Sequence, residues 1–264
     1  MHPFELHQPT SINAAVALLG QAQGTALAGG QSLVAAMKLR LAAPGALVDL
    51  GQIKDLSGIR REGNTIVIGA GTCHADVAAS AEVRQAIPAL AYLAGEIGDA
   101  QVRNMGTIGG SLANNDPSAC YPAAILALNA TIQTDRRRIA ADDFITGPFE
   151  TALASDELIT AVHFPIPERA AYIKFVNAAS RFALVGVFVG KSAGGVRVAV
   201  TGSASQAFRA TPIENALDRD FSEAAAKAVT MPAADLNSDL HASAAYRAHL
   251  IPVLAGRAVS KALG

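Results

Sequence analysis

Two glycine turns of nearly the same design are the feature that most constrains this chain. The first is Ala28-Gly29-Gly30-Gln31-Ser32-Leu33, and the second is Thr107-Ile108-Gly109-Gly110-Ser111. Each has two adjacent glycines shortly before a serine and contains no lysine or arginine. Consecutive glycines permit positive φ angles, so several backbone N–H groups can turn toward one ligand with no Cβ in the way. Because a helix beginning at Leu33 would add its N-terminal N–H groups, the pair suits a diphosphate bound by neutral donors.

A purely structural interpretation of these turns stays open at this point. One Gly-Gly pair with a nearby serine is commonly a hairpin turn or the cap of a helix, whereas two in one chain favour ligand binding. The usual nucleotide-binding fingerprints are missing, because the sequence has neither a G-x-G-x-x-G after a predicted strand nor a G-x-x-x-x-G-K-[ST] segment. A Rossmann dehydrogenase and a P-loop enzyme are therefore disfavoured.

The charge and cysteine content exclude other classes of protein. The 264 residues include 21 lysines and arginines against 22 aspartates and glutamates, and they include 9 phenylalanines, 4 tyrosines and no tryptophan. A net charge near zero and few aromatic rings argue against a nucleic-acid partner. Cys73 and Cys120 stand alone without a Cys-x-x-Cys motif or a Cys/His cluster. We therefore predict no metal site on this chain and a reducing, cytoplasmic setting.

Residues 8–37 contain no charged side chain, a pattern shared with membrane spans. Proline, glutamine and glycine residues interrupt this stretch, and it lacks the basic start of a signal peptide. We therefore predict no transmembrane segment and interpret the stretch as buried interior that also touches something polar.

The six histidines and the carboxylates are scattered along the chain, so no catalytic residue is predicted.

Hydrophobic periodicity divides the chain into three predicted units. Residues 1–58 are predicted to form a small α/β unit with a helix over 12–19 that Gly20 ends, a strand over 25–28, a helix over 33–41 and a strand over 46–50. Residues 59–167 are predicted to form a central α+β unit. Its expected elements are strands over 65–68, 130–134, 137–140 and 158–164 in a mixed or antiparallel sheet, and a helix over 83–97. Residues 102–116, which include the second glycine turn, suit neither helix nor strand.

Residues 168–264 are predicted to form a smaller C-terminal α+β unit. Three β-rich runs over 171–176, 184–189 and 196–201 favour an antiparallel meander. From residue 211 onward the pattern is helical, and we expect Pro252 to kink or divide the last helix, over 242–263.

Together these motifs resemble the FAD-binding subunit of the molybdenum hydroxylases, which include aerobic carbon monoxide dehydrogenase and xanthine dehydrogenase. The two glycine turns carry the resemblance, and further matches lie at residues 47–50, 68–71, 101–106, 157–160, 164–165 and 172–175. The likeness covers nearly the whole chain. It implies an α+β fold of the type with two Gly-Gly pyrophosphate turns: a small N-terminal α/β domain, a central domain with an antiparallel or mixed sheet, and a C-terminal three-stranded sheet plus helices.

The resemblance also implies a set of cofactor-binding residues. FAD would lie extended between the first two units, with its pyrophosphate held by both glycine turns and by the side chains of Thr107 and Ser111. The full set of candidates is Ala28, Gly29, Gly30, Gln31, Ser32, Leu33, Ile97, Val102, Thr107, Ile108, Gly109, Gly110, Ser111, Asn114, Asp116, Cys120, Ile159, Lys174 and Phe182. Residues near Ile97 and Ile159 would line the adenine and isoalloxazine regions, although each alone would be interpreted as a core residue. Lys174 and Phe182 would lie near the flavin, although Lys174 alone would be interpreted as a solvated strand lysine.

Cys120 departs from the family pattern. Relatives commonly carry an aspartate at this place, on the adenosine side of the cofactor, and a thiol does not replace a charged acceptor. Either Asp116 substitutes for it or the contact is lost, so Cys120 is expected to line the site or to be a buried small hydrophobe.

By this resemblance the chain is the electron-transfer subunit of a larger enzyme, an oxidoreductase. It would take electrons from the [2Fe–2S] clusters of a small partner subunit and pass them to an external acceptor. Substrate would be oxidised at the molybdenum cofactor of a large molybdopterin-binding subunit, in a dimer of heterotrimers. Two other hypotheses stay open: a self-contained FAD-dependent oxidoreductase, and a non-enzymatic nucleotide-binding or scaffold subunit. The organic substrate and the electron acceptor are not readable from this chain.

Overall fold

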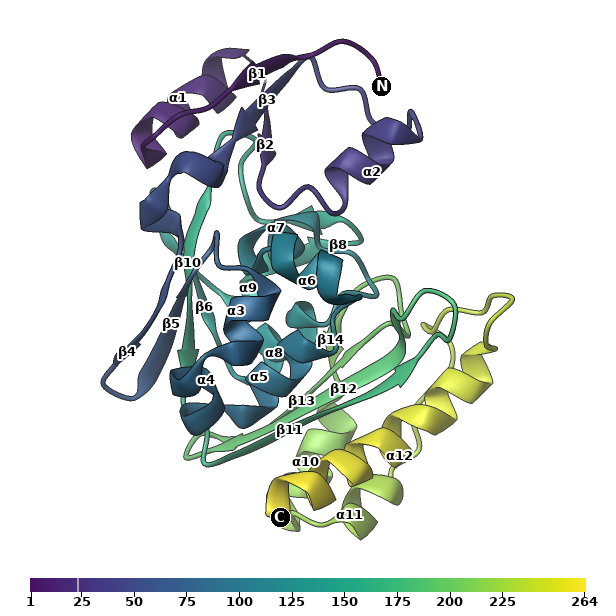
Figure 1. The fold of residues 1–264 in the computed structure, drawn as a ribbon. Helices are drawn as coiled ribbons and strands as arrows, with labels where there is room; N and C mark the ends of the chain where they lie inside the picture. Colours follow the sequence, from purple (N-terminus) through teal and green to yellow (C-terminus); the bar gives the residue numbers. More distant parts are fainter. Residues whose placement is uncertain (23) are drawn as a thin grey trace.

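The N-terminal part of the chain forms a small parallel sheet beside one helix (Figure 1). The computed structural model describes residues 1–22 and 24–264, and its first sheet has the order β1 (Glu5–His7), β3 (Ala46–Asp49), β2 (Thr25–Leu27). Helix α1 (Ile12–Ala22) shares a core with this sheet through Ala15, Leu19 and Val48. The prediction that Gly20 ends this helix is wrong, because the helix continues to Ala22 and a glycine inside a helix costs only about 1 kcal/mol.

The central part is built on a five-stranded antiparallel sheet. The chain reaches it through α2 (Leu33–Lys38), which begins where predicted, and through the 3₁₀ turns η1 (Leu50–Gln52) and η2 (Lys54–Leu56). The strand order is β4 (Ile59–Glu62), β5 (Thr65–Gly69), β10 (Ile159–Pro165), β6 (Thr131–Thr134), β7 (Arg138–Ala140). Strands β8 (Ile145–Gly147) and β9 (Glu150–Thr151) form a separate short hairpin. Of the two predicted arrangements, mixed or antiparallel, the antiparallel one is confirmed.

Short helices pack against this sheet, and two sequence predictions fail among them. The helices are α3 (His74–Ala79), α4 (Ala81–Ala86), α5 (Pro88–Gly95), α6 (Ala100–Met105), α7 (Ile108–Asn114), α8 (Tyr121–Ala127) and α9 (Ala141–Phe144). The single helix predicted over 83–97 is two helices, because the chain leaves helical geometry at Ile87 and Pro88 starts a new one. Residues 102–116 are helical over much of their length, because Asp99 caps α6 and Thr107 caps α7 through their side chains.

The C-terminal part is an antiparallel sheet covered by three helices. Its strand order is β11 (Arg169–Val176), β12 (Ala183–Ser192), β13 (Gly195–Thr201), β14 (Phe208–Arg209), so the predicted meander of the first three strands is confirmed. The helices are α10 (Thr211–Arg219), α11 (Glu223–Lys227) and α12 (Ala244–Leu263). Pro252 lies inside α12 without dividing it, because the buried apolar face continues on both sides of the proline.

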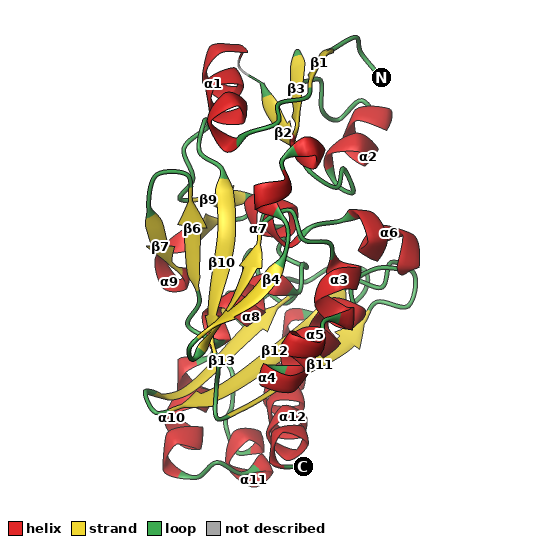
Figure 2. Ribbon diagram, turned by 60° about the vertical axis from the view of Figure 1, so that its left-hand side comes forward, coloured by secondary structure: helices red, strands yellow, loops and turns green. Residues whose placement is uncertain are grey.

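The four-stranded sheet is buried on both faces (Figures 1 and 2). Val185 and Val187 of β12 face α12 and its neighbours, whereas Phe188 joins the core of the central part together with Tyr172. The main core therefore crosses the predicted boundary between residues 167 and 168. The division into units at 1–58, 59–167 and 168–264 stays a prediction. No helix in the described residues is long and apolar enough to cross a membrane.

Candidate cofactor-binding site

The two glycine turns lie in direct contact although they are far apart in sequence. A Cβ atom at Gly29 would stand 1.9 Å from the carbonyl oxygen of Met105, just before the second turn. A Cβ atom at Gly110 would stand 3.6 Å from the Cβ of Ala28. The connection from β2 to α2 accordingly passes over α7 in Figure 1. Only glycine fits at position 29, because a side chain there would collide with backbone atoms that cannot move aside.

The first turn presents a run of backbone donors without partners. Within the residues that the structure describes, no acceptor is found for the backbone N–H groups of Gly29, Gly30, Gln31, Ser32 and Leu33. Gly30 has φ +69°, the left-handed conformation that glycine adopts without strain. The Gln31 side chain donates to the Gly29 carbonyl oxygen at 3.0 Å, which ties the turn together from within. The turn is thus fixed in shape and its donors remain available to a ligand.

The second turn differs from the prediction, because its backbone N–H groups are already used. Gly109 donates to the Ala70 carbonyl oxygen at 2.8 Å, and Gly110 donates to the Thr107 hydroxyl at 3.1 Å. The N–H groups of Ile108 and Ser111 are likewise bonded, to Thr72 and Thr107 carbonyl oxygens. The expectation that this turn presents a second set of free N–H groups at positive φ is therefore wrong. What remains for a ligand is the pair of hydroxyl groups on Thr107 and Ser111.

Gly109 is required for a packing reason. Its Cβ would lie 2.6 Å from the Cβ of Ala70 and 2.7 Å from the Ala70 carbonyl oxygen, so α7 can begin close to the end of β5 only with glycine there. Ala70 in turn donates its N–H to the carbonyl oxygen of Thr160. This chain of contacts places Ile159, at the start of β10, close to the second turn, although Ile159 itself is buried in the main core.

Sequence reasoning missed His74, which supports the second turn from behind. Its backbone N–H donates to the Gly106 carbonyl oxygen at 3.0 Å, and its Nε2 leaves no room for a Cβ at Gly106. Burial, assisted by the nearby charge of Arg103, lowers the pKa of His74 to about 4, so the imidazole is neutral at neutral pH. The ring packs against Tyr121 with centroids 5.4 Å apart. No metal-ligand or catalytic pattern surrounds His74 in the sequence, so only the fold reveals this position.

The structure brings Lys174 and the segment before α6 together. The Lys174 ammonium donates to the Glu96 carbonyl oxygen at 2.8 Å, so it is not a freely solvated lysine. Ile97, the next residue, is half-buried against the main core, and its carbonyl oxygen accepts a bond from Arg103. Val102 lies on α6, where it packs against Gly98. These residues form a second group of candidates, on the α5 to α6 side of the glycine turns.

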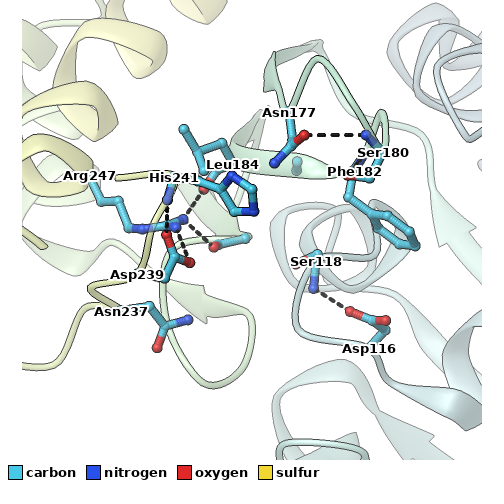
Figure 3. A pocket seen from close by; sticks show the side chains of 12 residues that line it. Asp116, Ser118, Asn177, Ser180, Phe182, Leu184, Asn237, Asp239, His241 and Arg247 are labelled. Atoms are coloured by element: carbon cyan, nitrogen blue, oxygen red, sulfur yellow. Dashed lines mark hydrogen bonds and ion pairs between the residues drawn. The ribbon is translucent and has the colours of Figure 1, made fainter. Parts of the chain in front are cut away.

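A third group lines a cavity of about 260 Å³ beside the loop between β11 and β12 (Figure 3). Phe182, 49% exposed, and Asp116 both line this cavity. The Asp116 carboxylate accepts a bond from the Ser118 N–H at 2.8 Å, which fixes its direction. Arg247, which the sequence did not single out, also lines the cavity; it is buried and donates to the carbonyl oxygens of Leu184 and Gly202 and to Asp239.

Cys120 is buried in the main core at the start of α8, where a small hydrophobe would fit. Asn114 is the last residue of α7 and is half-buried. Among the described residues, no cluster of histidine, cysteine and carboxylate side chains could hold a metal ion. Among the described residues, the first turn offers N–H groups without an acceptor and the second offers two hydroxyls, and the paired glycines carry no side chain. These residues fit a diphosphate-containing cofactor.

Comparisons with known proteins agree with this geometry. Residues 2–167 match the family described as FAD binding domain in molybdopterin dehydrogenase, and residues 166–262 match the CO dehydrogenase flavoprotein C-terminal domain. The chain is 37% identical to the carbon monoxide dehydrogenase medium chain of Hydrogenophaga pseudoflava, over 98% of this chain and 96% of the relative. It is 34% identical to the nicotine 6-hydroxylase medium subunit of Paenarthrobacter nicotinovorans, over 96% and 95% of the two chains.

Solved structures show the same likeness in three dimensions. A chain of carbon monoxide dehydrogenase from Hydrogenophaga pseudoflava superposes with a TM-score of 0.89 at 37% identity, covering 100% of this chain and 99% of that one. A chain of quinoline 2-oxidoreductase from Pseudomonas putida 86 gives a TM-score of 0.89 at 27% identity, covering 99% and 97%. The chain therefore belongs to the family of FAD-binding flavoprotein subunits of the molybdenum hydroxylases.

Proposed function

We propose that this chain binds FAD between its two glycine turns and carries electrons from a partner's [2Fe–2S] clusters to an external acceptor. The observation that carries the proposal is the run of N–H groups from Gly29 to Leu33, which find no acceptor among the described residues, next to the turn that carries the hydroxyls of Thr107 and Ser111. These donors would bond the diphosphate oxygens. Because the turns contain no lysine or arginine, affinity rests on the number of hydrogen bonds and on the close backbone approach that glycine allows.

The remaining candidates would hold the two ends of the cofactor. Ile97, Val102 and Lys174 would line one part of the site, and Asp116 and Phe182 would line the cavity of Figure 3. Ala28, Gln31, Ile108, Gly109, Gly110, Asn114, Cys120 and Ile159 complete the proposed set. When bound, FAD supplies the redox chemistry, and the protein contributes binding, orientation and electrostatics.

The relatives support an assembly of several subunits, because their names describe them as medium chains of dehydrogenases. The proposed partners are a large molybdopterin-binding subunit and a small [2Fe–2S] subunit, assembled as a dimer of heterotrimers. Substrate oxidation would take place on the large subunit. The two unpaired cysteines, Cys73 and Cys120, support a reducing, cytoplasmic location.

The test begins with the purified chain. It should be yellow, release FAD on denaturation and bind added FAD in a one-to-one ratio. A colourless preparation that takes up no FAD would contradict the proposal and favour a scaffold role. Reduction of the bound flavin by an organic substrate in the absence of partners would instead favour a self-contained oxidoreductase.

A further inference from the structure

The end of helix α2 exposes two leucines that alternate with two cations. Lys38, Leu39, Arg40 and Leu41 form this feature, here termed the 38–41 segment. Leu39 is 70% exposed and Leu41 is 79% exposed, among the most exposed large apolar side chains in the described residues. Solvent-exposed apolar side chains on an ordered segment are typical of a surface that binds a partner protein.

The backbone holds this segment in a defined shape. The N–H of Leu41 donates to the Ala36 carbonyl oxygen at 2.9 Å, and the N–H of Arg40 donates to the Met37 carbonyl oxygen at 3.1 Å. These two bonds are those of a Schellman motif, in which the left-handed position is usually glycine. Arg40 occupies that position with φ +60°, at a cost of about 1 kcal/mol. In this motif the residue after the left-handed position often packs against the last turn of the helix, whereas Leu41 is exposed.

The charge of the segment indicates what kind of surface it fits. Between residues 6 and 48 the only charged side chains are Lys38 and Arg40, and both are exposed. Neither forms an ion pair with another described residue. This part of the surface is therefore positive, and a complementary partner would offer an apolar pocket bordered by carboxylates.

The segment lies close to the proposed cofactor site. Helix α2 has six residues and starts at Leu33 in the first glycine turn, so at 1.5 Å per residue the segment is about 9 Å farther along the helix. A partner docked there would stand beside the cofactor. We infer that the 38–41 segment is the docking surface for the [2Fe–2S] subunit that delivers electrons, an inference that rests on the proposed function.

Photo-crosslinking tests the identity of the occupant directly. Leu41 is replaced by the photoreactive residue p-benzoylphenylalanine, and the variant is co-expressed with its two partner subunits, irradiated and analysed by mass spectrometry. The expected product joins this chain to the [2Fe–2S] subunit. A product with the molybdenum subunit, a product with a second copy of this chain, or no product at all would overturn the inference. The same replacement at Leu263, which is 50% exposed at the end of α12, is the control, because that end of α12 lies at the opposite end of the molecule from α2 (Figure 1).

Charge reversal provides an independent measurement. The variant K38E/R40E should retain FAD but lose at least tenfold more [2Fe–2S] subunit than the wild type when the tagged complex is washed, with iron per FAD as the readout. The wild-type contact should also weaken as NaCl rises from about 50 to about 500 mM, because salt screens exposed charges. If K38E/R40E keeps as much iron per FAD as the control variant Lys54→Glu, the inference is contradicted. Loss of FAD from the wild-type chain would instead contradict the proposed function.

Discussion

Gly109 and Gly110 are adjacent, yet they meet different constraints. A methyl group at Gly109 would press on Ala70 backbone atoms at 2.7 Å, whereas one at Gly110 would meet the Thr107 hydroxyl at 3.0 Å and the Ala28 Cβ at 3.6 Å, between the two turns. Gly109→Ala should therefore lower the free energy of unfolding by about 1 to 3 kcal/mol. Gly110→Ala should leave the fold intact and weaken FAD binding, because its methyl group occupies the proposed cradle.

Thermal denaturation of both variants without FAD, followed by FAD titration monitored by flavin fluorescence, separates these effects. The two substitutions serve as controls for each other. Unchanged FAD affinity in Gly110→Ala would contradict the placement of the diphosphate between the turns.

His74 should make cofactor retention depend on pH. Its folded-state pKa of about 4 lies below the ordinary value of 6.5, so the unfolded chain binds this proton more readily than the folded chain. Above pH 6.5 the imidazole is neutral in both the folded and the unfolded chain, so the free energy of unfolding is at its full value. It falls by up to about 3 kcal/mol as the pH falls from 6.5 toward 4. Arg103 faces the ring and adds to the repulsion. We therefore expect FAD release to begin between pH 6.5 and 4.

Fluorescence of released FAD across this pH range measures the effect. His74→Gln should flatten the pH dependence, whereas the exposed His249→Gln should leave it unchanged. A wild-type curve that is flat from pH 6.5 to 4 would contradict the assigned role.

The two turns could be recognised in the sequence, but the structural role of each glycine in them could not. Gly29 of the first turn lies against Met105 and Gly106, just before the second turn. The roles differ because a glycine needed for positive φ and a glycine needed for close packing look alike in a sequence. Gly30 is of the first kind and Gly109 of the second. The Lys174 bond to Glu96 and the support from His74 depend on contacts between distant segments, which no local pattern encodes.

At the scale of elements, strands were predictable and helix continuity was not. The alternating apolar residues of β12 and β13 locate their strands, and both lie near the predicted ranges. Helix α7 escaped prediction because two glycines in its first turn disfavour a helix by about 1 kcal/mol each. The Thr107 cap and the contact with Ala70 offset that cost. Local propensity is overridden here by packing that only the folded chain creates.

The end of α2 offers a prediction at this scale. Arg40 takes the left-handed conformation that glycine adopts freely. Arg40→Gly should therefore raise the stability of the chain by about 1 kcal/mol, equivalent to about 2 to 4 °C in melting temperature. Lys38→Gly, two residues earlier in helical geometry, should lower stability by about 1 kcal/mol. Thermal melts of the two FAD-free variants test this, and a destabilised Arg40→Gly would show that the arginine side chain stabilises the fold.

The whole molecule is held together by a core that crosses from the central part into the C-terminal sheet. Tyr172 and Phe188 are fully buried against helices of the central part. Arg197 of β13 adds polar ties, donating to the Leu126 carbonyl oxygen at 2.7 Å and to the Asn129 side chain at 2.8 Å. The C-terminal sheet should therefore depend on the central part for its stability.

Separate expression of chain segments tests this dependence. Residues 168–264 alone should melt without a cooperative transition and bind hydrophobic dyes, because one face of their sheet is uncovered. Residues 59–264, which keep the shared core, should melt cooperatively. A sharp transition in the shorter fragment, followed by circular dichroism, would show that the C-terminal part folds independently.

The N-terminal part should be the region that the cofactor stabilises most. Its core is small, built on Ala15, Leu19, Val48, Ile53, Leu56 and Leu158. The N–H groups of the first glycine turn have no acceptor in the part of the chain that the structure describes. A ligand that binds only the folded form adds about 2.7 kcal/mol when it is present at 100 times its dissociation constant. Hydrogen exchange of β2 and the start of α2 should therefore slow by about 100-fold on FAD binding.

Exchange in β12, buried on both faces, should change little, and Gly110→Ala should abolish the protection at equal FAD concentration. Equal protection of β12 and the first turn would show that FAD stabilises the molecule as one unit, because the N-terminal part would then open only together with the shared core.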